Sequence, residues 1–132
     1  MTNTKHDIRD AGDIKTMVFS FYDRVKTDGL LGPVFAQRIG GDWTGHLELM
    51  CRFWNTVLFN RSDYRGNPLQ KHVGLPLQQQ HFERWIELFS QTIDENFCGN
   101  VAEEAKHSAM RIAHTLYSRI QVKHNLSPLP KI

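Results

Sequence analysis

Hydrophobic residues recur every three or four positions over four long stretches of the chain, which is the spacing of one face of an α-helix. These stretches predict helices over residues 11–27, 42–59, 78–97 and 101–122. No segment alternates apolar and polar residues over a length typical of a strand. The pattern therefore predicts an all-α fold.

Residues that commonly begin or end helices flank these stretches. Asp10 and Asp42 are good N-cap residues. Asn100 is followed by Glu103 at the spacing of a capping box, with Asn in place of the usual Ser or Thr. The dipeptide Gly32-Pro33 is expected to enforce a turn, and "PVFAQRI" is expected to form a short helix with Pro33 in its first turn.

The composition is that of an ordinary globular protein. A chain of 132 residues, with 40% hydrophobic and 23% charged residues, fits one domain over residues 1–132. The polar residues 1–9 and the last residues, 125–132, are expected to be flexible. A formal net charge of +2 is too small to indicate a nucleic-acid or membrane partner.

Cysteine usage and the start of the chain indicate a cellular compartment. Two cysteines, Cys51 and Cys98, do not make a disulfide framework, and the first residues do not resemble a signal peptide. No apolar run approaches the roughly 20 residues of a membrane helix. We therefore expect a cytoplasmic protein.

Aromatic residues are abundant: eight Phe, three Trp and three Tyr make up 11% of the chain. Most of them fall on the apolar faces of the predicted helices. An ordinary aromatic core and a core that encloses a flat conjugated ligand both fit this composition, which does not choose between them.

One histidine lies in a segment rich in glycine and proline, "YRGNPLQKHVGLPL". Asn67-Pro68 is expected to start a helix and Gly74 to stop it, which leaves little more than one turn with His72 near its end. Carbonyls of that turn would accept a hydrogen bond from the imidazole Nδ1–H and leave Nε2 free to bind a metal. A histidine at a helix end is nevertheless more often a capping or surface residue.

Four segments in order carry a family resemblance: "FYDRVKTDGLLGPVF", "DWTGHLELMCRFW", "DYRGNPLQKHVGLPL" and "HFERWIELF". They extend from about residue 19 to residue 89, and together they resemble the truncated haemoglobins, specifically the group-three branch. The resemblance implies a two-over-two helical sandwich that holds haem b. It also implies that His72 is the proximal ligand of the iron.

The resemblance assigns the distal side of the haem to Tyr22, His46 and Trp85. Tyr22 would donate a hydrogen bond to a bound dioxygen ligand, and the indole N–H of Trp85 would act as a second donor. His46 would either donate to the ligand or swing outward to open access. Each residue has a plainer interpretation, because a core tyrosine, a core tryptophan and a buried or gating histidine fit the helical pattern equally well.

The resemblance also indicates residues that contact the cofactor itself. Phe35 resembles the phenylalanine that packs on the haem face, Met50 is expected to be a flexible wall and Phe53 a structural ring. Met50 or His46 is a candidate second ligand of the ferric iron. Basic residues are candidates to pair with the haem carboxylates, with solvated surface charge as the alternative: Arg52, Arg65 and Lys71.

Three functions fit these observations. The first is a haem protein that reversibly binds dioxygen, NO or CO and releases dioxygen slowly. The second is a nitric-oxide dioxygenase or a peroxidase-like enzyme, which would need an external electron donor such as a reductase. The third is a helical interaction domain without a cofactor, for which a missing haem absorption band would be the simplest test.

Overall fold

The computed structural model describes residues 5–41, 43–59 and 77–126, and their side chains as far as residue 119. The helices in these ranges are α1 (Ala11–Thr27), α2 (Leu31–Ile39), α3 (Trp43–Phe59), α5 (Gln79–Asn96) and α6 (Asn100–Leu126). The described residues contain no strand, only an isolated bridge between His6 and Phe97. The all-α prediction is therefore confirmed. The predicted cap Asp42 and the segment around His72 lie outside the described residues.

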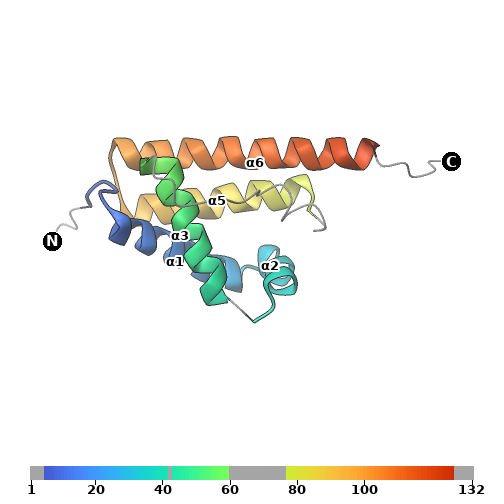
Figure 1. Cartoon of the computed structure of the whole chain (residues 1–132), viewed down its shortest axis with the longest axis horizontal. Coiled ribbons are helices and arrows are strands. Elements are labelled where there is room, and N and C mark those ends of the chain that lie inside the picture. The colour runs from blue at the N-terminus through green and yellow to red at the C-terminus, as the bar shows by residue number, and fades with distance from the viewer. Residues whose placement is uncertain (1–4, 42, 60–76, 127–132) are drawn as a thin grey trace.

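The helices form two layers (Figure 1). In one layer α1 packs against α2 and α3, and in the other α5 packs against α6. The layers meet where α1 contacts α5 and α3 contacts α6. This is the two-over-two arrangement that the family resemblance implied. α6 runs beyond the predicted end at residue 122, since no glycine or proline interrupts the chain before Pro128.

The start of α1 follows the sequence prediction, but the start of α2 does not. Gly32 was expected in a turn, whereas it lies inside α2. The Asp28 carboxylate accepts hydrogen bonds from the N–H groups of Leu30 and Leu31, at 3.1 Å and 2.9 Å, which begins the helix earlier. A Cβ at Gly32 would lie 2.8 Å from the Lys26 carbonyl oxygen. Glycine is therefore needed at this position for close packing against the end of α1.

Residues 5–9 lie against the helices, which their polar composition did not lead us to expect. Asp7 accepts hydrogen bonds from the backbone N–H groups of Val101 and Ala102, at 2.9 Å and 2.8 Å. The cap of α6 therefore comes from Asp7, and not from Asn100 as predicted. Gly99 adopts φ +133°, and a Cβ there would lie 2.5 Å from the Asp7 carboxylate. This N-terminal segment thus closes the end of the α5–α6 layer.

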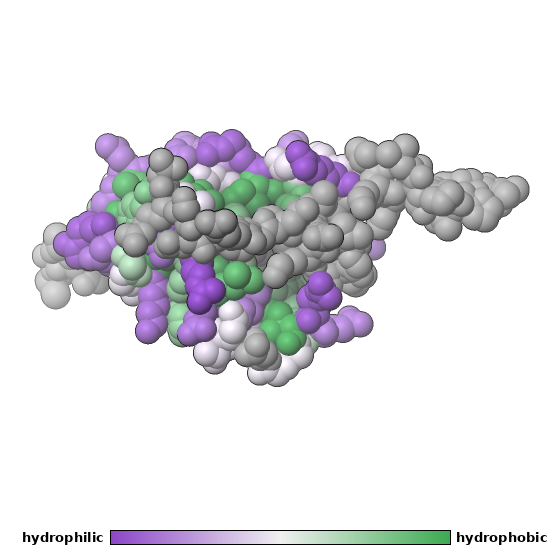
Figure 2. All heavy atoms as spheres, viewed as in Figure 1, coloured by the Kyte–Doolittle hydropathy of each residue, from purple (hydrophilic) through white to green (hydrophobic). Residues whose placement is uncertain are grey.

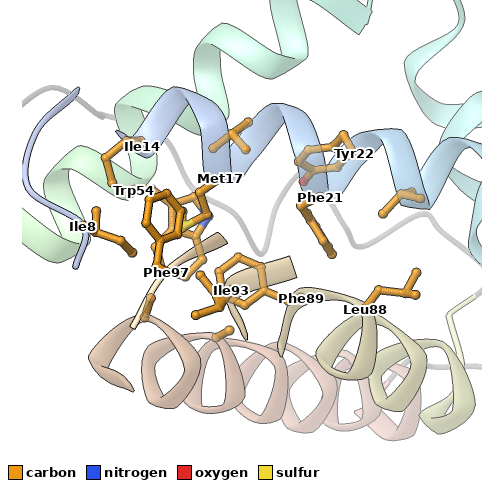
Figure 3. Packing of buried hydrophobic residues seen from close by; sticks show 14 of the residues in the cluster. Ile8, Ile14, Met17, Phe21, Tyr22, Trp54, Leu88, Phe89, Ile93 and Phe97 are labelled. Carbon is orange, nitrogen blue, oxygen red and sulfur yellow. The ribbon is translucent and has the colours of Figure 1, made fainter. Parts of the chain in front are cut away.

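The core lies between α1 and α5 (Figure 3). Ile14, Met17 and Ile93 are fully buried, and Phe21 and Phe89 meet edge to face with ring centroids 5.2 Å apart. Hydrophilic residues occupy much of the outer edge of the face shown in Figure 2. Within the described ranges, none of the helices is both long and apolar enough to span a membrane.

Candidate functional site

A cavity of about 540 Å³ opens between the two layers of helices. Its walls come from α1, α2 and α3 on one side and from α5 and α6 on the other. Every predicted site residue within the described ranges lines this cavity: Tyr22, Phe35, His46, Met50, Phe53 and Trp85. The structure thus brings together side chains from four helices that the sequence pattern alone did not connect. His72 lies outside the described residues.

Tyr22 points from α1 into a group of rings. Its ring centroid lies 5.0 Å from that of His46 and 6.0 Å from that of Phe35, with the rings edge to face. The side chain is buried, and burial raises the pKa of the Tyr22 phenol well above its ordinary value of 10. Tyr22 therefore keeps its proton at neutral pH, and its hydroxyl is able to donate a hydrogen bond toward the cavity.

His46 is half-buried on the face of α3 that packs against α1, and its Nε2 atom is buried. Edge-to-face contacts with Tyr22 and Trp43, at centroid distances of 5.0 Å and 6.4 Å, hold the ring in the cavity wall. A neutral imidazole donates from one nitrogen and accepts at the other. His46 is therefore the described residue of this ring cluster that is suited to exchange a proton with a ligand.

Trp85 is held between buried rings of α5 and α1. It stacks on Phe89 with centroids 5.7 Å apart and an interplanar angle of 8°, and it meets Phe21 edge to face at 5.5 Å. Phe89 also stacks on Trp54, at 5.0 Å. Fully buried neighbours on this side leave the Trp85 ring little freedom to change its orientation. Its indole N–H can only donate a hydrogen bond.

An ion pair not foreseen from the sequence lies one residue from Trp85. Arg84 donates from Nε to the Asp28 carboxylate at 2.7 Å, and the Asp28 side chain is only 5% exposed. Burial alone would raise the pKa of Asp28, but the N–H of Leu31, Arg84 and the N–H of Leu30 outweigh it and lower the pKa below its ordinary value. The pair ties the α1–α2 corner to α5 beside the cavity. No local pattern links residues 56 positions apart.

The charged residues that the structure describes in the cavity wall are basic. Arg38 from α2 and Arg52 from α3 line it, and no aspartate or glutamate is found among the described lining residues. Arg52 was a predicted carboxylate partner and Arg38 was not, while Arg65 and Lys71 lie outside the described residues. Apolar rings with arginines in the wall suit a flat, apolar molecule that carries negative groups.

His81 also lines the cavity, although the sequence offered no partner for it. It lies in the first turn of α5, where its Nδ1 accepts a hydrogen bond from the Gln78 N–H at 2.9 Å. A glutamate or glutamine three residues after the N-cap would have indicated this contact, whereas histidine at that position is not part of the usual pattern.

Comparisons with known proteins agree with this geometry. The family model described as bacterial-like globin matches residues 7–121. The group 3 truncated hemoglobin ctb of Campylobacter jejuni is 36% identical over 105 residues, which cover 76% of this chain and 80% of the relative. The group 1 truncated hemoglobin GlbN of Nostoc sp. is 35% identical over 71 residues, covering 53% of this chain and 58% of the relative.

A solved structure shares the fold. The crystal structure of the group III truncated hemoglobin from Campylobacter jejuni superposes with a TM-score of 0.82 at 29% sequence identity. The match covers 89% of this chain and 95% of that chain.

Proposed function

Because the chain belongs to the bacterial-like globins and, among them, to the group-three truncated haemoglobins, we propose that it binds dioxygen and other diatomic molecules reversibly. Haem b, with its iron, is the cofactor of this family. When bound, it supplies a metal site that takes up a small ligand, whose retention depends on the surrounding pocket.

The residues that line the cavity fit haem. Phe35, Met50 and Phe53 offer apolar walls for a flat ring system, and Arg38 and Arg52 offer cations for its two carboxylates. The absence of acidic side chains among the described lining residues removes a source of repulsion. By family resemblance His72 would hold the iron.

The observation that carries the proposal is the convergence of Tyr22, His46 and Trp85 on one cavity from three different helices. A diatomic ligand that gains negative charge on binding would accept hydrogen bonds from the Tyr22 hydroxyl and the Trp85 indole. Hydrogen bonds to charged groups contribute about 1.5–3 kcal/mol each. One such bond would slow ligand release about tenfold or more. Slow dioxygen release is therefore expected.

The dissociation rate of dioxygen tests the role of these donors. Tyr22→Phe and Trp85→Phe should each speed release about tenfold, since each removes one donor while keeping an aromatic ring. Tyr117→Phe is the matched control, because Tyr117 lies on α6 against Phe82 and is not among the lining residues. Stopped-flow displacement of dioxygen by CO measures all three. Unchanged rates in both pocket variants would contradict the proposed donor roles.

Replacement of His72 tests the link to the iron separately. His72→Leu should abolish ligation of the iron by this imidazole and weaken haem retention, and His114→Leu, at an exposed position on α6, should change neither. Resonance Raman spectra of the ferrous protein report the iron–imidazole bond directly. A His72→Leu protein that kept this bond would overturn the assignment of the proximal ligand.

A haem enzyme is the second candidate, and the contact between His46 and Tyr22 favours it. Dioxygenation of NO and reduction of peroxide both need a pocket that holds a polar ligand, and peroxide chemistry also needs a group that moves a proton, a role that His46 suits. Repeated turnover would require an external electron donor, for example a reductase in the cytoplasm. Steady-state NO or peroxide consumption with a supplied reductant distinguishes an enzyme from a ligand-binding protein.

A further inference from the structure

We propose that His81 is a haem-binding residue that donates a hydrogen bond from Nε2–H to a carboxylate of the cofactor, an inference that rests on haem binding by this chain. His81 lines the cavity while being only 9% exposed. It lies one helical turn before Trp85 on α5, at the end of the wall where this helix begins.

The proton of His81 is located by a backbone contact. The Gln78 N–H donates to Nδ1 at 2.9 Å, so Nδ1 carries no hydrogen. A neutral imidazole must then carry its proton on Nε2. In this tautomer neither nitrogen offers a free lone pair to iron, because one accepts from the backbone and the other is protonated. His81 is therefore a hydrogen-bond donor, and not a competitor of His72 for the metal.

The Nε2–H needs an acceptor, and among the described residues none accepts from it. A ligand that fills the cavity would cover this donor, and covering it without an acceptor is costly, so the ligand gains by offering one. The pyrrole nitrogens of haem are occupied by the iron, which leaves its two carboxylates or the diatomic ligand. The diatomic ligand already has Tyr22, His46 and Trp85 as candidate donors. The edge of the cofactor is therefore the expected partner of His81.

The charges of the cavity support the choice of a carboxylate. Arg38 and Arg52 come from α2 and α3, in the opposite layer from α5, and no described lining residue is acidic. His81 would thus add a donor from the α5 side to the two guanidinium groups. The competing explanation is a purely structural role, in which the ring serves only as an acceptor for the first turn of α5.

A pair of substitutions and a pair of cofactors separate these explanations. His81→Asn keeps an acceptor near the position of Nδ1 for the Gln78 N–H but loses the Nε2–H donor. His81→Phe keeps a ring but loses both functions. Each protein is loaded either with haem or with haem whose two carboxylates are methyl esters, and the rate of haem transfer to an excess of an apoglobin acceptor is measured. His114→Asn, on the exposed face of α6, is the matched control.

The wild type and His114→Asn should release the ester faster than haem. In His81→Asn and His81→Phe this ratio of release rates should fall about tenfold, the value of one hydrogen bond to a charged acceptor. A wild-type ratio in His81→Asn would overturn the proposal, as would an equal acceleration of both cofactors. A change in dioxygen dissociation with an unchanged ratio would also overturn it, by assigning the donor to the diatomic ligand.

The thermal unfolding of the apoproteins keeps the test decisive. If His81 only caps α5, His81→Phe should have a lower melting temperature but an unchanged ratio of ester release to haem release. His81→Asn should melt close to the wild type. If the proposal for His81 fails, the protein still binds haem, and dioxygen dissociation still responds to Tyr22→Phe and Trp85→Phe. If the proposed function fails, these two substitutions leave dioxygen dissociation unchanged. The two failures are therefore distinguishable.

Discussion

At one end of the interface between α1 and α5 the side chains fill the space, whereas at the other end they surround a cavity. Ile14, Met17 and Ile93 have no exposed surface at the packed end. At the cavity end, Phe35 and Trp85 are only partly buried. Aliphatic side chains predominate at the packed end, although Trp54 and Phe97 also lie there (Figure 3). The residues named at the cavity end are aromatic.

The difference shows how one small domain combines stability with an open site. Aliphatic packing at one end contributes to stability whether or not the cavity is filled. The residues of the other end retain apolar surface that a cofactor can cover. Phe89 joins the two ends, since it is fully buried and stacks on both Trp54 and Trp85.

The largest expected effect comes from removing the ring of Phe89, which joins the two ends. Phe89→Ala should lower the free energy of unfolding of the apoprotein by about 3–5 kcal/mol, because it leaves a void among buried rings. Phe35→Ala should cost the apoprotein less than half as much but should speed haem release, because its ring lines the cavity. Urea unfolding and haem transfer measure the two quantities. Equal losses of apoprotein stability would mean that the two ends do not differ as described.

Replacement of Asp7 tests the contribution of the packed end to stability without changing a residue of the cavity wall. Asp7→Asn should lower the free energy of unfolding at pH 7 by about 1–3 kcal/mol, since it removes the carboxylate charge that accepts hydrogen bonds from the backbone N–H groups of Ile8, Val101 and Ala102. Haem release and dioxygen dissociation should stay unchanged. Asp23→Asn, on the exposed side of α1, is the control, with an expected change within about 0.5 kcal/mol.

The effect of Asp7→Asn should depend on pH. Burial alone would raise the pKa of Asp7, but hydrogen bonds from the N–H groups of Val101, Ile8, Ala102 and Asn100 lower it below the ordinary 3.8. A lowered pKa in the folded state contributes stability that is present above about pH 4 and is lost as the pH falls through the folded value. Urea unfolding from pH 7 to pH 3 should therefore show the two proteins converging in acid.

Arg24 and Arg84 form ion pairs that join α1 and the α1–α2 corner, respectively, to α5. Their replacement gives a matched pair of variants with smaller expected effects. Arg84→Met should lower the free energy of unfolding more than Arg24→Met does, because it leaves the buried Asp28 carboxylate without its cation, and it should alter dioxygen dissociation severalfold through Trp85. Arg24 pairs with the exposed Glu95 carboxylate, away from the cavity. Arg24→Met should cost about 0–1 kcal/mol and leave dissociation unchanged. If Arg24→Met matched Arg84→Met in both measurements, the position of the Asp28 pair beside the cavity would be irrelevant.

Helices and their buried faces could be predicted from the sequence because both depend on residues a few positions apart. The spacing of Ile14, Met17 and Phe21 defines one face of α1. Asp10 caps this helix as predicted, with its carboxylate accepting from the Asp13 N–H at 2.9 Å. The candidate site residues came from the family resemblance, because helical spacing alone describes Tyr22 and Trp85 equally well as core residues.

Tertiary structure decided the contacts between residues far apart in the chain. Asp7 was assigned to a polar N-terminal tail, and only the fold brings it to the N–H groups of α6, more than 90 residues later. Asp28 and Arg84 are likewise unremarkable until α1 packs against α5, and His81 acquires a role only where α5 borders the cavity. Helical periodicity is a property of the local backbone, whereas capping across elements, burial of an ion pair and the lining of a cavity depend on how the helices pack.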